Sequence, residues 1–266
     1  MNLLARIPTA IVLVSIAVFG ILKGSIVFFT GVSIITLLCL HEILKMKKLY
    51  ISKLYTVLLY CFLILFLLLT QAPSYTLFWN SPFIIIASTL IVVISCLEVF
   101  FKKTIATPNK YSQALISTIK IGLAFPFFIL LRNTPYGLDI TFLFIIIVAT
   151  VDSASYFSGK FLGKTKFNTI SPNKTLEGSF GGIITTIVSS VIMLTILNYN
   201  LVAFFPLIFI IIFLAILGDL HESLQKRSFN VKDSASILPG HGGIYDRMDS
   251  YILALPITYY YVIFFL

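Results

Sequence analysis

Between Gly218 and Ser250 the chain carries a dense set of ionisable side chains, flanked by two strongly apolar runs. The segment holds half of the ten Asp and Glu residues of the protein, namely Asp219, Glu222, Asp233, Asp246 and Asp249. Its basic and histidine residues are His221, Lys226, Arg227, Lys232, His241 and Arg247. Charge beside a membrane span is costly unless it faces water, pairs internally or binds an ion, so a functional site is expected here.

The spacing of the carboxylates indicates the kind of chemistry. Asp219 and Glu222 are three residues apart, as are Asp246 and Asp249, so each pair shares a helical face. Carboxylate oxygens suit Mg²⁺, which commonly bridges protein carboxylates to substrate phosphates. The basic residues among them suit phosphate groups. Any single charge could equally well form an internal salt bridge, but the joint spacing favours a site for a metal ion and phosphates.

A second polar segment begins with Asp152, which follows the apolar run FLFIIIVAT. An intramembrane carboxylate normally needs a cation or a hydrogen-bond donor, and we favour a functional role for it. Ser155 and Gly159 follow at helical spacing on the same face. The alternative for these small residues is structural, because they would allow another helix to approach closely.

The residues from Ser171 to Glu177 read as a turn that leads into a helix. Hydroxyls and free N–H groups at such a helix start favour a phosphate, and Lys174 supplies a matching charge. The alternative is a plain helix cap, with Lys174 contacting a lipid phosphate. A P-loop ending at Gly163-Lys164-Thr165 is excluded, because position 158 is Ser where that motif needs Gly.

Composition fixes the fold class. The 266 residues are 59% hydrophobic, with a mean hydropathy of +1.04, which excludes a soluble protein and predicts an all-α, polytopic integral membrane protein. We expect about nine spans: Ile7–Leu22, Ser25–Leu44, Leu54–Thr70, Pro82–Phe101, Ser117–Leu131, Ile140–Phe157, Phe180–Leu197, Val202–Leu217 and Tyr251–Leu266. Residues 1–110 would hold about four N-terminal spans, and 111–266 a catalytic region of about five, with polar cytoplasmic loops at 158–178 and 218–250.

Basic residues in short loops predict the orientation. With the N-terminus inside, nearly all Lys and Arg lie on the cytoplasmic side, and only Lys23 and Arg132 lie near the outer ends. We therefore expect a multi-pass protein of the cytoplasmic membrane whose N-terminus and active site are cytoplasmic, with the first span retained as a helix. The net charge of +9 fits contact with anionic membrane lipids rather than with nucleic acid, because the basic residues are split among separate loops.

Two further residue sets call for plain structural interpretations. Cys39, Cys61 and Cys96 lie singly in apolar runs without metal-ligand spacing, and we expect them to act as packing residues. Glu98 lies four residues before Lys102, so we expect an ion pair near the end of a helix.

Three motifs together resemble a known family. From Ser223 the chain reads Ser-x-x-Lys-Arg-x4-Lys-Asp-x5-Pro-Gly-His-Gly-Gly-x-x-Asp-Arg-x-Asp-Ser, ending at Ser250. This resembles the signature of the phosphatidate cytidylyltransferases, also called CDP-diacylglycerol synthases. Asp152-x-x-x-Tyr-x-x-Gly159 and Ser171-Pro-x-Lys-Thr-x-Glu-Gly178 resemble the two upstream motifs of that family. Departures are Gln225 in place of an apolar residue, Leu176 in place of an aromatic, and Ser153-Ala154-Ser155 in place of a Thr/Gly/Ala-type triplet.

The resemblance implies that CTP and phosphatidate react to give CDP-diacylglycerol and diphosphate, with Mg²⁺ required and a second cation left open. It implies metal binding by Asp219 and Asp246, with Asp152 or Asp249 in support. Phosphates would be held by the basic residues Lys226, Arg227, Lys232 and Arg247, and His241 would donate to a phosphate oxygen. Ser171, Lys174 and Glu177 would help to bind the nucleotide or to order the loop. The other expected substrate-binding residues are Gly178, Ser223, Gly242 and Gly243. A homodimer is expected by family analogy only.

Two rival functions are weaker. Another CTP-using lipid enzyme, acting on an isoprenoid-ether analogue or as a lipid kinase, would share much of the chemistry, but the full motif from Ser223 to Ser250 disfavours it. A transporter or channel would need polar residues through both leaflets, whereas here they gather on one side.

Overall fold

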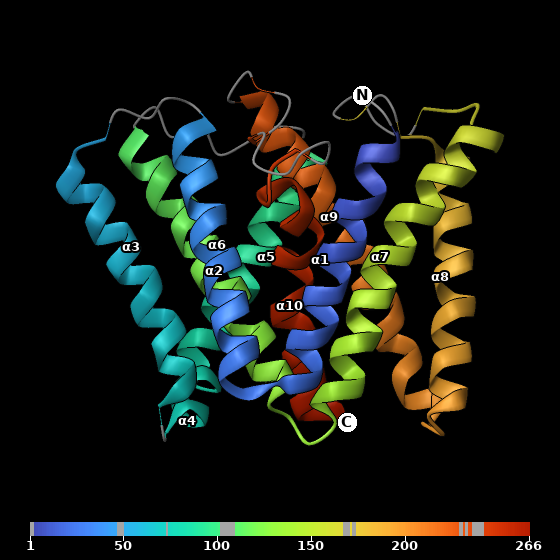
Figure 1. Ribbon diagram of the computed structural model, residues 1–266, viewed down its shortest axis with the longest axis horizontal. Helices are drawn as coiled ribbons and strands as arrows, with labels where there is room; N and C mark the ends of the chain where they lie inside the picture. The colour runs from blue at the N-terminus through green and yellow to red at the C-terminus, as the bar shows by residue number, and fades with distance from the viewer. Residues whose placement is uncertain are drawn as a thin grey trace.

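The computed structural model describes residues 3–46, 51–72, 74–101, 110–166, 171, 174–228, 231, 234–235 and 242–266. Within these ranges the chain is a bundle of long helices (Figure 1). The helices are α1 (Leu3–Lys23), α2 (Ser25–Met46), α3 (Lys53–Leu68), α4 (Tyr75–Trp79), α5 (Pro82–Phe100), α6 (Lys110–Arg132), α7 (Gly137–Leu162), α8 (Leu176–Ile196), α9 (Leu201–Ser228) and α10 (Tyr245–Phe265), with a 3₁₀ turn at Leu69–Gln71. A backbone in hydrocarbon must satisfy its own hydrogen bonds, which is why apolar runs of this length form helices.

The expected all-α membrane architecture is confirmed. Each of the nine predicted spans overlaps one of the long helices, and in the described part of the chain eight helices are long and apolar enough to cross a membrane. The remaining one is α1, whose apolar portion Ile11–Lys23 is shorter. The short helix α4 was not predicted, since five residues carry too little periodicity to identify.

Several helices extend further into the polar segments than the sequence predicted. Helix α9 continues to Ser228 instead of ending at Leu217, and α10 begins at Tyr245 instead of Tyr251. Hydropathy marks where side chains stop being apolar, but the backbone hydrogen bonds of a helix continue past that point. Helices α7 and α9 thus end inside the predicted polar segments 158–178 and 218–250, and α8 and α10 begin inside them.

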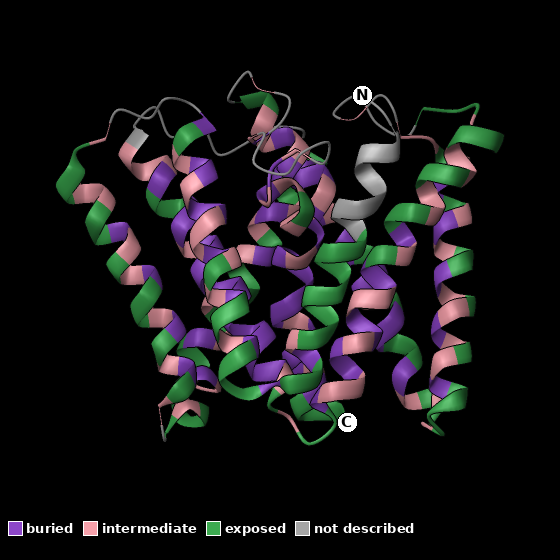
Figure 2. Cartoon of the chain, viewed as in Figure 1, coloured by how far each residue is buried: buried purple, intermediate pink, exposed green. Residues whose placement is uncertain are grey.

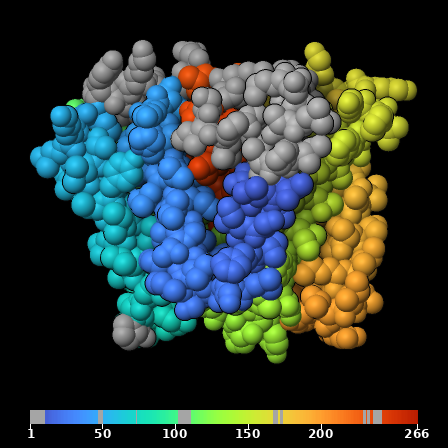
Figure 3. Space-filling view, in the orientation of Figure 1, coloured from blue at the N-terminus to red at the C-terminus, as the bar shows by residue number. Residues whose placement is uncertain are grey.

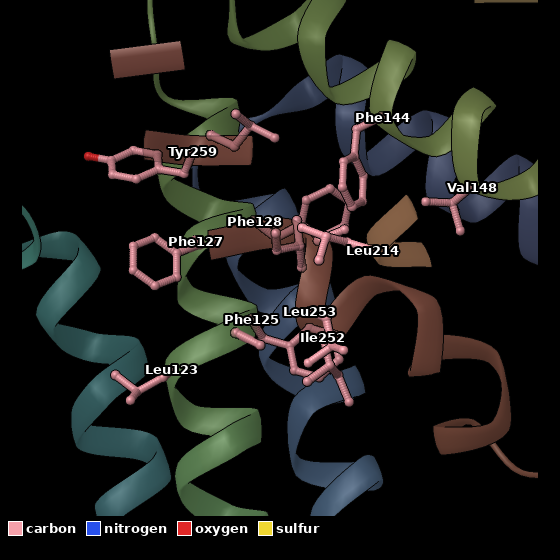
Figure 4. Close-up of a cluster of buried hydrophobic side chains, with 14 of the residues drawn as sticks. Leu123, Phe125, Phe127, Phe128, Phe144, Val148, Leu214, Ile252, Leu253 and Tyr259 are labelled. Carbon is pink, nitrogen blue, oxygen red and sulfur yellow. The ribbon is translucent and has the colours of Figure 1, made fainter. Parts of the chain in front are cut away.

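The bundle is organised around α6. Its apolar stretch is 78% buried, against 22% for α3 at the edge, and it packs against α2, α3 and α10. Figure 2 shows the same gradient, with buried residues on the central helices and exposed ones on the outer faces of α3 and α8. Large side chains fill the centre, among them Phe127, Phe128 and Tyr259 (Figure 4). Helices from the first and second parts of the chain thus share one core.

Helices α7 and α8 pack through small residues. A Cβ atom on Gly178 would lie 2.8 Å from the Ser155 carbonyl oxygen and 2.9 Å from Gly159 Cα. One turn on, a Cβ atom on Gly182 would collide with the Ser155 hydroxyl. The expectation that Ser155 and Gly159 allow close helix approach is confirmed, and this contact fixes the segment that carries Asp152 against the start of α8.

Gly182→Val should destabilise the protein by about 1–3 kcal/mol, because the new side chain overlaps Ser155 and lies 2.9 Å from the Val151 carbonyl oxygen. Gly31→Val is the matched control, since Gly31 lies inside α2 and a Cβ atom there would meet nothing within 4 Å. Thermal unfolding in detergent should show a lower Tm for Gly182→Val than for Gly31→Val. Equal Tm values would contradict the packing assigned to this contact.

Candidate functional site

The predicted site residues gather at one end of the bundle. The last turns of α9, the start of α10 and the α7–α8 connection all lie at the end that also holds the N-terminus, and the C-terminus lies at the other (Figure 1). Lys232 and His241, which the sequence assigned to this site, lie outside the described residues. The other predicted residues come from α7, α8, α9 and α10 and the segments that join them.

A glycine brings α9 and α10 into backbone contact. A Cβ atom on Gly218 would lie 2.6 Å from the Asp249 carbonyl oxygen and 3.0 Å from Ser250 Cα. The next residue on α9 is Asp219, so the close approach delivers its carboxylate beside Asp249. Ser250 in turn donates from Oγ to Asp152 Oδ2 of α7 at 3.5 Å. Three helices thus contribute one aspartate each to the same region.

We call Asp152, Asp219 and Asp249 the acidic cluster. Their negative charges repel one another, which would cost energy without a nearby cation. Lys174, at the start of α8, supplies one through a close ion pair between its Nζ and Asp219 Oδ2. Arg247 is exposed, and its charge also acts favourably on Asp152. The cluster therefore combines acidic and basic groups, as the sequence predicted for a metal and phosphate site.

The donor set fits Mg²⁺ only together with other ligands. Among the residues that the structure describes, no group of three Asp, Glu, His or Cys side chains is placed to hold a metal ion. Mg²⁺ usually binds through one or two carboxylates and completes its octahedron with water and substrate phosphate. The oxygen-only acidic cluster matches that pattern, and does not match a closed all-protein cage.

Asp246 lies in a different arrangement from the acidic cluster. Its Oδ1 accepts from Lys226 Nζ at 3.0 Å, and both of its oxygens accept from the Ser234 backbone N–H at 3.1 Å. Its Oδ2 also accepts from the Gly243 N–H at 2.9 Å. The carboxylate predicted as a metal ligand thus holds the chain that leads into α10, and the α10 carboxylate that lies near Asp219 is Asp249.

Lys226 joins two helices through two carboxylates. Its Nζ lies 2.7 Å from Glu222 Oε2, one turn earlier on α9, and 3.0 Å from Asp246 Oδ1 on α10. The three side chains are 14%, 1% and 8% exposed, so the group is largely shielded from solvent. Lys226 was predicted to hold phosphate; here its charge is shared between two acids. In the described part of the α9–α10 region, Arg227 and Arg247 are exposed.

The start of α8 is ordered by Glu177. Its carboxylate accepts from the backbone N–H groups of Lys164 at 3.1 Å and Thr165 at 3.1 and 3.2 Å. Thr175 caps the helix by accepting from the Gly178 N–H at 3.1 Å. Of the two roles expected for Glu177, loop ordering is the one its contacts support. Ser171 accepts from the Lys174 N–H through its backbone oxygen at 3.1 Å.

The remaining predicted substrate-binding residues occupy distinct positions. Gly178 is buried in the α7–α8 contact, which is a packing position. Ser223 is half-buried on α9. Gly242 has φ +81°, a left-handed conformation that favours glycine, beside the Asp246 carboxylate. Gly243 is buried, and a Cβ atom there would collide with Ser234 Oγ and the Glu42 carboxylate.

The unusual Gln225 has two well-placed partners. Its Nε2 donates to Ser117 Oγ of α6 at 3.1 Å, and its Oε1 accepts from the Tyr245 hydroxyl of α10 at 2.8 Å. An apolar residue here would leave both hydroxyls without this amide. These two hydrogen bonds therefore accommodate Gln225 at a position where the resembled motif has an apolar residue.

A buried polar group of three residues was not predicted from the sequence. His221 Nε2 lies 2.7 Å from Glu98 Oε2 and 3.0 Å from Lys120 Nζ, and Lys120 Nζ lies 3.3 Å from the same Glu98 oxygen. The group ties α5, α6 and α9 together. Lys120 inside an apolar run was the available signal. The expected partner of Glu98, Lys102, lies outside the described residues.

A second missed residue is Glu42, which is fully buried on α2. Its carboxylate accepts from the backbone N–H groups of Ile244 and Tyr245, both at 2.8 Å, and from Ser234 Oγ at 2.9 Å. A lone Glu near the end of a hydrophobic helix gave no indication that its donors lie about 200 residues away in sequence. Glu42 thus links the N-terminal helices to the start of α10.

Comparison with known proteins identifies the family of the chain. The model of the cytidylyltransferase family matches residues 4–265. The chain belongs to the cytidylyltransferase family. It is 36% identical to the phosphatidate cytidylyltransferase of Bacillus subtilis (strain 168) over 273 residues, covering 98% of this chain and 97% of the relative. It is 32% identical to the proteins of that name from Staphylococcus haemolyticus (strain JCSC1435) and Staphylococcus aureus (strain COL), over 95% of this chain and 96% of each relative.

For this cytidylyltransferase, Lys120→Met should destabilise the fold by about 3–5 kcal/mol, because it removes the ammonium group that lies 3.3 Å from the buried Glu98 carboxylate. Adding Glu98→Gln should cost less than the sum of the two single changes, since the carboxylate charge that Lys120 pairs with is then removed as well. Chemical unfolding in detergent measures both effects. The control is Lys45→Met, at an exposed lysine of α2, and strict additivity of the two changes would contradict the direct contact.

Proposed function

We propose that this protein transfers CMP from CTP to phosphatidate, giving CDP-diacylglycerol and diphosphate. Support comes from its family and from relatives named phosphatidate cytidylyltransferase that match along nearly their whole length. The structural observation that carries the proposal is the acidic cluster with Lys174 and Arg247 at one end of a membrane bundle. Such a site can bind the phosphate of a membrane lipid together with the triphosphate of a nucleotide that arrives from the aqueous side.

In the proposed reaction a phosphate oxygen of phosphatidate forms a bond to the α-phosphorus of CTP. The bond from that phosphorus to the oxygen bridging to the β-phosphate breaks, and diphosphate leaves. Two anions must come together, so neutralisation and alignment supply most of the catalysis. Lys174 has three N–H donors and can retain one on Asp219 while the others contact phosphate oxygens. Arg247 and Arg227, both exposed, offer paired N–H donors to the same groups.

We assign Mg²⁺ to Asp219 and Asp249, with Asp152 in support. The ion would neutralise phosphate charge and stabilise the charge that develops on the leaving diphosphate. Asp246, first expected as a ligand, instead holds Lys226 and the backbone that leads into α10. A second cation and a homodimer remain predictions from family analogy.

The proposed orientation puts the site at the cytoplasmic face of the inner membrane. The C-terminal ends of α2, α7 and α9 and the N-terminal ends of α3 and α10 lie at the same end as the N-terminus (Figure 1). These helix ends carry basic residues, namely Lys45, Lys160, Lys226, Lys53 and Arg247, which favours a cytoplasmic location for this end. The face holding the α8–α9 turn would then be external.

Transfer of label from α-³²P-CTP to a lipid-extractable product tests the function. Purified protein with phosphatidate and Mg²⁺ should form labelled CDP-diacylglycerol, and omission of either phosphatidate or Mg²⁺ should abolish it. In parallel reactions, phosphatidate is replaced by an isoprenoid-ether phosphatidate or by an unphosphorylated lipid acceptor. Labelling of one of these instead of phosphatidate would overturn the substrate assignment.

Asp219→Asn and Asp249→Asn should each lower the rate at least about 100-fold and raise the Mg²⁺ concentration that gives half the maximal rate. Asp246→Asn should lower the rate without moving that concentration. The matched control is Asp139→Asn, which changes a carboxylate bonded to Tyr199 at the opposite end of the bundle. A shifted Mg²⁺ dependence in Asp246→Asn and not in Asp249→Asn would restore the first assignment.

Thiol labelling in intact cells tests the orientation. In a background without native cysteines, Asn198→Cys in the α8–α9 turn should react with a membrane-impermeant maleimide from outside, because Asn198 is exposed and the proposed orientation would make this turn external. Lys164→Cys, exposed in the α7–α8 connection, should react only after permeabilisation. The reverse pattern would invert the proposed topology.

A further inference from the structure

Glu42 stands apart from the other carboxylates in how it is satisfied. It is completely buried, and within the described part of the chain no Lys, Arg or His nitrogen lies within 4 Å of it. Among the described residues, its donors are the Ile244 N–H, the Tyr245 N–H and the Ser234 hydroxyl. Burying a carboxylate among neutral donors costs free energy, so these hydrogen bonds are needed to stabilise it.

The contacts place Glu42 at the beginning of α10. Ile244 is the N-cap residue of this helix and Tyr245 is its first helical residue, and Ile244 contributes no side-chain cap of its own. The first N–H groups of a helix have no partner within it and carry a partial positive charge. The α2 carboxylate therefore acts as a helix cap supplied from about 200 residues away.

Glu42 and Asp246 hold the same short pieces of chain from two sides. Ser234 donates its hydroxyl to Glu42 and its backbone N–H to Asp246. Gly243 donates its N–H to Asp246 and leaves no room for a side chain against Glu42. Figure 3 shows orange and red atoms of the C-terminal part of the chain between the two blue helices, in agreement with the contact between α2 and α10.

We propose that Glu42 is a positioning residue for the CMP-transfer site. By fixing where α10 begins and how it is rotated, it sets the place of Arg247 and Asp249, which lie on the first turn and a half of that helix. The hydrogen bonds of Glu42 go to Ser234, Ile244 and Tyr245, so its effect on these two residues passes through the helix start. This inference rests on the proposed function, and it gives the N-terminal helices a part in the site.

The test compares Glu42→Gln with Asp139→Asn, the same change from carboxylate to amide at the opposite end of the bundle. The amide of Glu42→Gln presents its own N–H groups to at least one of the described donors, so α10 loses part of its cap. We expect kcat for CMP transfer to fall about 100-fold, as for a small misplacement of catalytic groups, with KM for CTP little changed. Asp139→Asn should retain the wild-type rate.

Hydrogen exchange supplies a readout that does not depend on the substrate. In Glu42→Gln the amides of residues 243–250 should exchange faster than in wild type, while those of α8 stay unchanged. An inactive wild-type protein would overturn the proposed function, but the exchange result would still decide the role of Glu42. Wild-type kcat in Glu42→Gln, or faster exchange spread evenly over all helices, would overturn the positioning role.

Ser234→Ala keeps the inference falsifiable if Glu42→Gln does not fold. It removes one of the donors to Glu42 and should lower kcat about tenfold. A tenfold change in rate corresponds to about the free energy of one hydrogen bond. Combined with a folded Glu42→Gln it should have little further effect, because the two groups act through one contact. Ser234→Ala with wild-type kcat and wild-type exchange at 243–250 would contradict the proposal. Glu42→Asp, which keeps the charge on a shorter side chain, should recover part of the lost kcat.

Discussion

A carboxylate at the edge of a hydrocarbon layer has to find its donors within the protein, and this requirement shapes the polar end of the bundle. Glu42 takes its hydrogen bonds from the start of α10, Asp246 takes its own from α9 and two stretches of backbone, and Asp219 pairs with Lys174 at the start of α8. Apolar surfaces give helices little reason to associate in lipid, so such contacts and close packing hold them together. The same charges that stabilise the bundle therefore form the site.

The acidic cluster also requires that the backbones of neighbouring helices approach one another closely. Gly218 lets α9 contact α10 directly, and Gly178 and Gly182 do the same for α8 against α7. Without these contacts the carboxylates of α7, α9 and α10 would be separated by a layer of side chains. Small residues thus set the distance between helices, and the distance between helices sets the geometry of the acidic cluster.

The arrangement also separates two kinds of acidic residue that look alike in sequence. Asp246 and Asp249 lie on the same helix, three residues apart, yet one is saturated by Lys226 and backbone N–H groups and the other lies with Asp219 and Asp152. A carboxylate that already accepts several hydrogen bonds serves structure. A carboxylate beside others of the same charge is suited to a cation.

The sequence by itself determined the membrane class, the helical spans and the gathering of polar residues at one end, because these follow from hydropathy and the spacing of charges along a helix. Its motifs also indicated the family. The tertiary structure decided which charges meet. The contacts of Glu42 with Tyr245 and of Glu98 with Lys120 join distant segments, and no local pattern encodes them. The same holds for the partners of Asp246 and Asp249, since identical residue types three positions apart on one helix meet different groups once the chain is folded.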